Sequence, residues 1–369
     1  MLKEAAITAI GTATPTYKRS QREIVALLTR VLQLSAAETR LLTSIYKATG
    51  IDYRYSVFSD GLREGTENIF FPQDPTASLP TTAARMQIYK NNALPLALQA
   101  IAQCFSGQAN FSITEVTHLI TVSCTGMYAP GIDLDIVRHC GLSSSTQRTC
   151  INFMGCYGAF NALKVADSIC KAEPNARVLI VAVELCSIHY QKSRHKDHII
   201  SNALFSDGAA AVMVQASPEK EKYFSLNHFY CDVLPKTQHE MAWTIADSGF
   251  DIILSSYVPD VIERGIEHFA HQLFEKAALQ RDEIDFFAIH PGGLKILEAC
   301  EKALSITKEQ NSYSYHVLRN YGNMSSVTIL FVLQALWQDI KKSDHGKNIF
   351  SCAFGPGLTL ESVLLGVVA

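Results

Sequence analysis

Short apolar runs rich in β-branched residues recur along this chain between longer stretches with helical periodicity, and this alternation constrains the fold more than any other feature. Because nearly every position in these runs is apolar, we predict strands that helices bury on both faces. The alternation therefore predicts an α/β fold. The runs are HLITVSC (118–124), RVLIVAVEL (177–185), AAAVMV (209–214), DFFAIH (285–290), KNIFSCAF (347–354) and LTLESVLLGVV (358–368).

The two halves of the chain resemble each other in the spacing of their motifs. Cys156, which precedes the helical stretch GAFNALKVADSIC, follows Cys124 by 32 residues, and Asn323, which precedes SSVTILFVLQALWQDI, follows His290 by 33. Each half closes with a glycine turn before an apolar strand, SDGAAAVMV and GPGLTLESVLL. We predict a duplicated module with an N-terminal half over 1–225 and a C-terminal half over 226–369. Similar rhythms occur in α/β proteins without duplication, so that alternative stays open.

Composition excludes several functional classes. The chain has 369 residues, a formal net charge of -3 and a pI near 6.5, which gives no electrostatic footprint for nucleic acid. No apolar stretch reaches the length of about 18 residues that a transmembrane helix needs, and the N-terminus does not read as a signal peptide. The ten cysteines show no C-x-x-C spacing and are expected to be reduced thiols. We expect a cytoplasmic protein that binds no nucleic acid and does not insert into a membrane. The polar stretch FSDGLREGTEN (58–68) is expected to be a surface loop.

Cys156 is the first candidate for chemistry. It lies where the strand-like INFM meets an apolar helix, and the positive end of that helix is expected to lower the pKa of the thiol. Gly155 is expected to let a substrate approach closely. The alternative is an inert buried cysteine.

His290 and Asn323 are the second and third candidates. His290 ends an apolar strand and precedes Pro291-Gly292-Gly293, a position that favours a site residue over a core residue. Asn323 lies in the turn YGNMSS before a helix, where it could equally be an N-cap. A Cys, a His and an Asn at equivalent places suit acyl transfer. The thiolate forms a thioester, an imidazolium stabilises the resting thiolate, and His and Asn donate hydrogen bonds to the oxygen of an enolate.

In order along the chain, these motifs resemble the type III polyketide synthases, the chalcone synthase-like family of the thiolase superfamily. HPGG, GNMSS and FGPG in this order are specific to that branch, while SCTG and VELCS resemble its bacterial members. The matching stretches are AIGTATP (9–15), HLITVSCTG (118–126), APG (129–131), GCYGAF (155–160), VELCSIHY (183–190), LFSDGAAAV (204–212), AIHPGGLKIL (288–297), YGNMSS (321–326) and FGPGLTLE (354–361).

The resemblance implies a homodimer of subunits with the five-layered αβαβα thiolase fold. It places the three catalytic residues on Cys156, His290 and Asn323, and a phenylalanine at the mouth of the site on Phe205. It implies that an acyl-CoA starter loads on the cysteine, that malonyl-CoA extends it by decarboxylative Claisen condensation, and that a cyclised polyketide such as a pyrone or resorcinol leaves. No metal or redox cofactor is implied.

The resemblance also implies a substrate pocket. Ile252 stands where plant chalcone synthases have a large aromatic residue, which favours a roomier channel and, as a hypothesis, a fatty acyl starter. Lys47 and Arg54 are the candidates for contacts to CoA phosphates, although a solvated surface pair explains them as well. The pocket residues are Cys124, Thr125, Cys186, His189, Ile252 and Ser325, with Gly355, Pro356 and Gly357 as the loop that shapes the floor.

Three other interpretations were weighed against this one. The histidines of HYQKSRHKDH (189–198) could suggest a metal site, but the resemblance implies that its later part is a surface loop, which its Lys and Arg content fits, and no metal is expected. A β-ketoacyl-ACP synthase III-like enzyme also uses Cys, His and Asn, but its usual HQAN context is replaced here by HPGG. A non-catalytic thiolase-fold partner protein is disfavoured because all three catalytic residue types are present.

Overall fold

The computed structural model describes residues 4–59, 70, 78–106, 112–216, 218, 221–255 and 257–369. Of the predicted surface loop 58–68, only the first two residues lie within these ranges. No helix in the described part of the chain has the length and apolar character needed to cross a membrane. Within the same ranges, no group of three or more His, Cys, Asp or Glu side chains could hold a metal ion.

Nine strands form one mixed sheet in the order β11-β12-β13-β8-β1-β7-β6-β4-β5. All six predicted strands are present within a few residues of their predicted limits; β1, β5 and β8 were not predicted. The bounds are β1 Ala5–Ala13, β4 His118–Ser123, β5 Gln147–Asn152, β6 Arg177–Leu185, β7 Asp207–Ala216, β8 Tyr223–Val233, β11 Phe286–Ile289, β12 Asn348–Gly355 and β13 Thr359–Val368.

The two ends of this sheet repeat one topology. In the first, β1 pairs antiparallel with β7, β7 antiparallel with β6, and β6 parallel with β4. In the second, β8 pairs antiparallel with β13, β13 antiparallel with β12, and β12 parallel with β11. The short pairing of β1 with β8, at Ala6 with Ser225 and Ile7 with Phe224, joins them. A division at 225 would fall inside β8, and the proposed domain limits stay a prediction.

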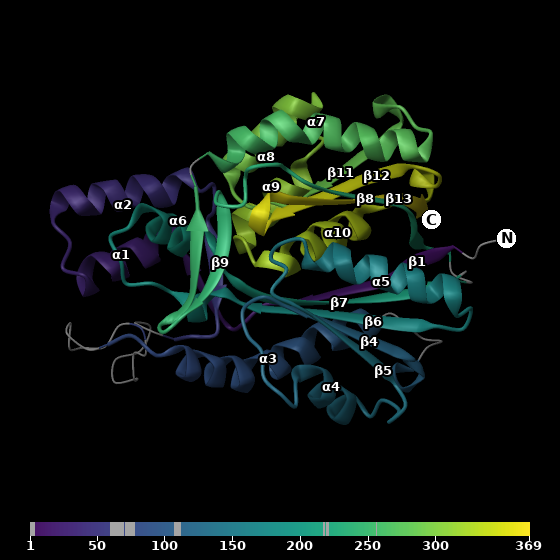
Figure 1. Ribbon diagram of the computed structural model, residues 1–369, viewed down its shortest axis with the longest axis horizontal. Helices are drawn as coiled ribbons and strands as arrows, with labels where there is room; N and C mark the ends of the chain where they lie inside the picture. The colour runs from purple at the N-terminus through teal and green to yellow at the C-terminus, as the bar shows by residue number, and fades with distance from the viewer. Residues whose placement is uncertain are drawn as a thin grey trace.

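Helices separate and cover the two ends of the sheet in five layers (Figure 1). Helices α3 (Thr82–Phe105) and α4 (Ile132–Cys140) cover the outer face of the first half, and α7 (Val258–Ala277) and α8 (Leu294–Leu304) that of the second. Between them lie α5 (Gly158–Ala172) and α10 (Thr328–Asp339). The predicted αβαβα thiolase-like fold is therefore confirmed.

The middle helices follow from their sequences. Thr328–Leu333 of α10 is buried at every position, because strands of both halves and neighbouring helices enclose it. Along β12, Ile349 packs in the middle core and the next residue, Phe350, packs in the outer core beneath α7 and α8. This alternation across a buried strand explains why both faces are apolar.

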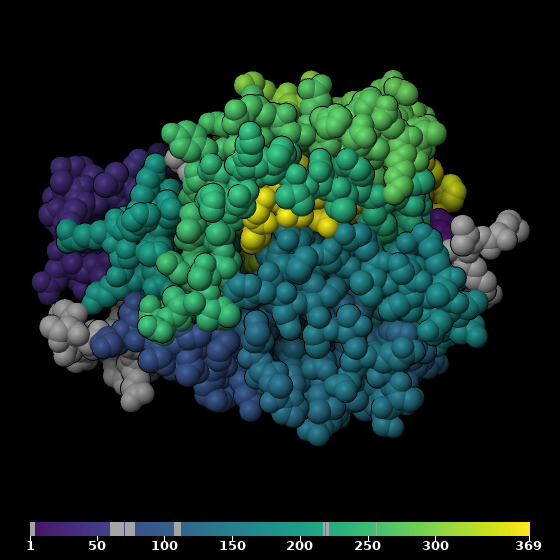
Figure 2. Space-filling model, viewed as in Figure 1, coloured from purple at the N-terminus to yellow at the C-terminus, as the bar shows by residue number. Residues whose placement is uncertain are grey.

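Smaller elements gather at one end of the molecule (Figure 1). The two-stranded ribbon β2–β3, whose strands are separated in the chain by α1 and α2, and the hairpin β9–β10 lie with three helices around the cavities described below. Helix α9 packs in the second half. In Figure 2, teal residues of the first half and green residues of the second half meet along a seam, and yellow C-terminal residues are visible in the hollow between them. The bounds are β2 Tyr17–Ser20, β3 Tyr53–Ser56, β9 Met241–Ala246, β10 Gly249–Leu254, α1 Gln21–Val31, α2 Ala36–Ala48, α6 Lys196–Leu204 and α9 Ser312–Tyr321.

Candidate active site

The repeated topology brings the candidate catalytic residues to one cavity. Cys124 directly follows β4 and His290 directly follows β11, which are equivalent strands of the two halves. Cys156 and Asn323 lie just before α5 and just before the turn into α10, the two middle helices. All four residues line the same cavity, together with Ser325. Its other lining residues are Phe153, Gly155, Phe205, Met241, Ala242, Trp243, Ile252, Leu254, Gly292, Ile296, Phe354 and Pro356.

Among the described residues, no Lys, Arg, Asp or Glu lines this cavity. The side chains of the wall are apolar except for the thiols, the imidazole, the Asn323 amide, the Ser325 hydroxyl and the indole N–H of Trp243. A charge that enters therefore loses its water without meeting a charged side chain in the wall, which is costly for any ion.

Burial raises the pKa of the Cys156 thiol to about 12, although hydrogen bonds from the Ser325 and Asn323 side chains and from the backbone lower it. The prediction of a lowered thiol pKa is therefore wrong for the substrate-free site. Helix α5 begins at Gly158, two residues after the thiol, and the nearby charge of Glu184 raises the pKa further. Burial and this carboxylate together outweigh the helix dipole.

His290 is 1% exposed, and its backbone N–H donates to the carbonyl of Cys352 at 2.8 Å. Neither ring nitrogen has a hydrogen-bond partner among the described residues. Burial lowers its pKa to about 3, so the imidazole is neutral. The expected resting imidazolium is therefore wrong for this state, because an isolated charge at this place would be desolvated.

The amide of Asn323 is oriented by its neighbours. Its Oδ1 accepts from the backbone N–H of Ser325 at 2.9 Å, and its Nδ2 donates to the carbonyl of Gly292 at 3.2 Å. This arrangement fixes which end of the amide is the donor, and the same side chain also donates to the Cys156 sulfur, which lowers the pKa of that thiol. Asn323 is not the N-cap of α10, which is Val327.

Gly155 serves a different purpose from the expected one. Its φ is +81°, and a Cβ there would lie 2.2 Å from Cδ of Pro356. The group that approaches closely is therefore the predicted floor loop rather than a substrate. A Cβ on Gly355 would meet the ring of Tyr157 at 2.5 Å, and Gly357 has a φ of +73°, so this loop needs glycine on both sides of Pro356.

Glu184 is a residue of the site that sequence reasoning missed. It lies on β6, is 0% exposed, and accepts hydrogen bonds from the Cys124 N–H and from the hydroxyls of Thr125 and Ser326. Burial raises its pKa to about 6, while these hydrogen bonds lower it. A glutamate in the otherwise apolar run RVLIVAVEL was the signal that could have identified it.

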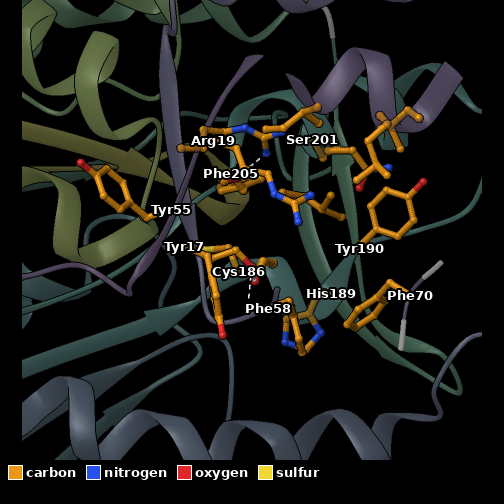
Figure 3. Close-up of a pocket in the computed structure, with 18 of the residues that line it drawn as sticks. Tyr17, Arg19, Tyr55, Phe58, Phe70, Cys186, His189, Tyr190, Ser201 and Phe205 are labelled. Carbon is orange, nitrogen blue, oxygen red and sulfur yellow. Dashed lines mark hydrogen bonds between the residues drawn. The ribbon is translucent and has the colours of Figure 1, made fainter. Parts of the chain in front are cut away.

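A second cavity adjoins the first. Phe205, Trp243 and Ile252 line both, so these three side chains form the partition between them. The rings of Phe205 and Trp243 meet edge to face, with centroids 6.1 Å apart. Figure 3 shows Cys186, His189, Tyr190 and Phe70 around the second cavity. Sequence reasoning found Phe205 and Ile252 but missed Trp243, which stands in the hairpin that was not predicted.

His189 forms a fixed part of the wall. Its Nε2–H donates to the carbonyl of Thr125 at 2.7 Å, and its Nδ1 accepts from the backbone N–H of Phe250 at 2.9 Å. Its ring stacks on Phe250, with centroids 4.2 Å apart. Burial lowers its pKa to about 3, so it is neutral, as these contacts require. Thr125 is 0% exposed and lines neither cavity.

The two candidates for CoA phosphate contacts lie in different settings. Lys47 is exposed in the last turn of α2. Arg54 lines the second cavity, where Nε donates to Oε1 of Gln21 at 3.0 Å and Nη1 donates to the carbonyl of Phe205 at 2.6 Å. The pair is therefore not a solvated surface pair, and a contact to CoA stays a prediction for both.

The later part of the histidine-rich stretch 189–198 is not wholly the predicted surface loop, because helix α6 begins at Lys196. His189 is in the wall, His195 precedes α6, and Nε2 of His198 lies 2.6 Å from Oδ1 of Asp251 on β10. The pair of His198 and Asp251 attaches the β9–β10 hairpin to α6.

Comparisons with known proteins agree with this geometry. The family described as "Chalcone and stilbene synthases, N-terminal domain" matches residues 2–218, and its C-terminal counterpart matches residues 225–369. The chain is 32% identical over 292 residues to the "Alpha-pyrone synthesis polyketide synthase-like Pks18" of Mycobacterium tuberculosis, covering 78% of this chain and 74% of that protein. It is 31% identical over 372 residues to type III polyketide synthase A of Arabidopsis thaliana, covering 98% of this chain and 92% of that protein.

Solved structures give the same result. PKS-I from the brown alga Ectocarpus siliculosus superposes with a TM-score of 0.92 at 28% identity, covering 99% of both chains. The C-terminal type III domain of Steely1, a type I/III hybrid from Dictyostelium, superposes with a TM-score of 0.88 at 26% identity, covering 99% of this chain and 100% of that one. The fold, the shared cavity and these matches establish that the chain belongs to the chalcone and stilbene synthase family and is a type III polyketide synthase, an acyltransferase that condenses CoA thioesters.

Proposed function

We propose that Cys156 carries the acyl chain while His290 and Asn323 activate malonyl-CoA. One observation carries this assignment: a thiol, a neutral imidazole and an oriented amide line one cavity whose described wall holds no charged side chain. The proposed substrates are CoA thioesters, and no metal or redox cofactor is needed for the steps below.

Acylation begins with proton transfer from the Cys156 thiol to His290. Burial disfavours the thiolate alone and the imidazolium alone, since each would lack a counter-ion. The transfer creates both charges together, and each is then the counter-ion of the other. The thiolate attacks the starter thioester, a new C–S bond forms, and CoA leaves with the proton from His290.

The apolar wall of the cavity favours decarboxylation of the malonyl group. The malonyl carboxylate loses its hydration between Phe205 and Trp243 and gains no cation there, so departure as neutral CO2 relieves the desolvation cost. The electrons of the broken C–C bond move to the thioester oxygen as an enolate. Neutral His290 and the Nδ2 hydrogen of Asn323 donate to that oxygen.

The enolate carbon then attacks the acyl-Cys156 carbonyl, forming a C–C bond and releasing the Cys156 thiolate. The longer chain returns to the cysteine for another round, and the product leaves as a cyclised polyketide such as a pyrone or resorcinol. CoA thioesters and ten free cysteines suit a cytoplasmic enzyme.

We also propose that the enzyme is a homodimer. Strand β5 is at the edge of the sheet, and five of its six residues are exposed, all but Ile151. An exposed edge strand is a template for pairing with a second copy. Light scattering after size-exclusion chromatography would measure the mass. The N–H groups of Gln147 and Phe153 donate to the carbonyls of Thr117 and Ser123. The alternate N–H of Cys150 therefore faces the free edge, and Cys150→Pro should weaken the dimer. A monomeric native protein would contradict this proposal.

The deciding experiment is mass spectrometry of the products formed from malonyl-CoA and acetyl, fatty acyl or aromatic acyl-CoA starters. Products longer than the starter by two-carbon units are expected with the native enzyme and are expected to be absent with Cys156→Ala. Condensation with malonyl-ACP but not with malonyl-CoA would instead support a β-ketoacyl-ACP synthase III-like reaction. Products from Cys156→Ala at the native rate would refute the covalent role of the thiol.

A further inference from the structure

Arg54 holds the backbone of Phe205, the residue that partitions the two cavities. Its Nη1 donates to the Phe205 carbonyl at 2.6 Å, and its Nε donates to Oε1 of Gln21 at 3.0 Å. Gln21 in turn donates through Nε2 to the carbonyl of Ala203 at 2.7 Å. One guanidinium therefore connects β3, the start of α1 and the segment that carries Phe205.

The other side of this segment fixes Asn323. Phe205 and Asn323 form an isolated parallel bridge, in which the Asn323 N–H donates to the Leu204 carbonyl at 3.0 Å and the Ser206 N–H donates to the Asn323 carbonyl at 2.8 Å. Asn323 thus receives its backbone position from the residues on either side of Phe205. A shift of Phe205 would be transmitted to the amide that faces the thiol.

Residues on either side of Phe205 are also held by α2 and β3. The Tyr46 hydroxyl donates to the Asn202 carbonyl at 3.3 Å, and the Tyr55 N–H donates to Oγ of Ser206 at 2.8 Å. Arg54 supplies the contact at the residue whose side chain enters both cavities. It is therefore the link between the β2–β3 ribbon and the partition.

An arginine at this position has a cost that its contacts must offset. No described carboxylate forms an ion pair with it, and burial lowers its pKa, although the Tyr46 hydroxyl and, less strongly, Asp207 raise it. The forked guanidinium donates in two fixed directions, towards Gln21 and towards Phe205, which a lysine ammonium on a flexible stem does not reproduce. The geometry rather than the charge alone is thus the property that the site uses.

We propose that Arg54 is a positioning residue that fixes the Phe205 ring relative to the Asn323 amide and so couples decarboxylation to condensation. This inference rests on the proposed decarboxylative mechanism. If the partition shifts, water reaches the enolate, and its carbon takes a proton from water. The malonyl-CoA consumed then leaves as acetyl-CoA and CO2 without a new C–C bond.

The test is the ratio of acetyl-CoA to polyketide formed from malonyl-CoA and a starter, measured by liquid chromatography and mass spectrometry. In Arg54→Met this ratio should rise by roughly ten- to a hundredfold, the effect expected of a small misplacement near reacting groups. Arg54→Lys should lie between Arg54→Met and the native enzyme, since an ammonium can keep one of the two contacts.

The matched control is Lys222→Met. Lys222 also donates to backbone carbonyls, those of Trp337 at 2.5 Å and Ile340 at 3.4 Å, and lines neither cavity. Its loss should leave the ratio unchanged even if the melting temperature falls. If Arg54→Met does not fold, Gln21→Ala, which removes the partner of Nε, should raise the ratio by a smaller factor.

The outcomes are distinguishable. A native ratio in folded Arg54→Met, or in Gln21→Ala where Arg54→Met does not fold, would overturn the positioning role. An equal rise in Lys222→Met would show a general effect of lost stability and would also overturn it. Failure of the native enzyme itself to form polyketide or acetyl-CoA from malonyl-CoA would overturn the proposed mechanism, on which this inference rests.

Discussion

Replacing Glu184 by glutamine tests how much stability the site gives up to hold a buried carboxylate. Burial raises the pKa of Glu184 from 4.5 to about 6. A carboxyl group with a higher pKa in the folded state binds its proton more tightly there than in the unfolded chain. Its contribution to stability is therefore greatest below about pH 4.5, is lost as the pH rises from 4.5 to 6, and stays lost above that pH.

The size of this loss follows from the pKa difference. A difference of about 1.5 units between 4.5 and 6, at about 1.36 kcal/mol for each unit, corresponds to about 2 kcal/mol. Between pH 4.5 and 7 the free energy of unfolding of Glu184→Gln should therefore fall by about 2 kcal/mol less than that of the native protein. Urea unfolding followed by the fluorescence of Trp243 and Trp337 would measure it at each pH.

Asp207 supplies the matched control. Burial raises its pKa from 3.8 to about 6, a difference of about 2.2 units or about 3 kcal/mol, and it contacts Ser187 and Val57 rather than Cys124. Asp207→Asn should thus remove a larger share of the same pH dependence. If Glu184→Gln kept the native slope while Asp207→Asn lost its share, the reasoning about Glu184 would be refuted.

The same variant has a catalytic consequence. The charge of Glu184 raises the pKa of Cys156, so Glu184→Gln should lower that pKa and shift the pH dependence of Cys156 alkylation by iodoacetamide to lower pH. Asp207 is not among the main groups that set the pKa of Cys156, and Asp207→Asn should shift the profile less than Glu184→Gln does. Mass spectrometry of the peptide that contains Cys156 would measure both rates.

Two further substitutions test the geometry of the cavities. Gly155→Ala should destabilise the fold by about 2 kcal/mol or more in thermal melts, because its methyl group would lie 2.2 Å from Pro356 Cδ at a φ of +81°. The control Gly141→Ala, at a φ of +64° with no atom within 4 Å, should cost about 1 kcal/mol. Equal costs for the two variants would contradict the argument. Trp243→Ala should join the two cavities and admit longer acyl-CoA starters, as mass spectrometry of the products would show. Trp337 lines neither cavity, so Trp337→Ala should leave the starter range unchanged. An unchanged starter range in Trp243→Ala would contradict the role of Trp243 as a partition.

The strands and middle helices could be predicted because their signals are local. A strand such as β6 is apolar at almost every position, and α10 has an unbroken apolar run at 329–333. The burial of both elements can therefore be read from their sequences. The β9–β10 hairpin was not predicted because its residues divide between cavity wall and exposed positions such as Ile245, which is 57% exposed. Such a mixture gives no clear period, and Trp243 was missed for that reason.

Residue positions and residue electrostatics differ in how far the sequence determines them. The repeat placed Cys156, His290 and Asn323 at equivalent sites, since topology fixes where a strand or helix ends. The pKa of Cys156 instead depends on Glu184, which reaches the site from β6, and on burial by elements of both halves. A helix dipole is visible in the sequence as a helix start, but the desolvation that overcomes it arises only when the two halves pack together. The residues at such a junction can therefore be predicted from the sequence, but the direction of their pKa shifts can be obtained only from the structure.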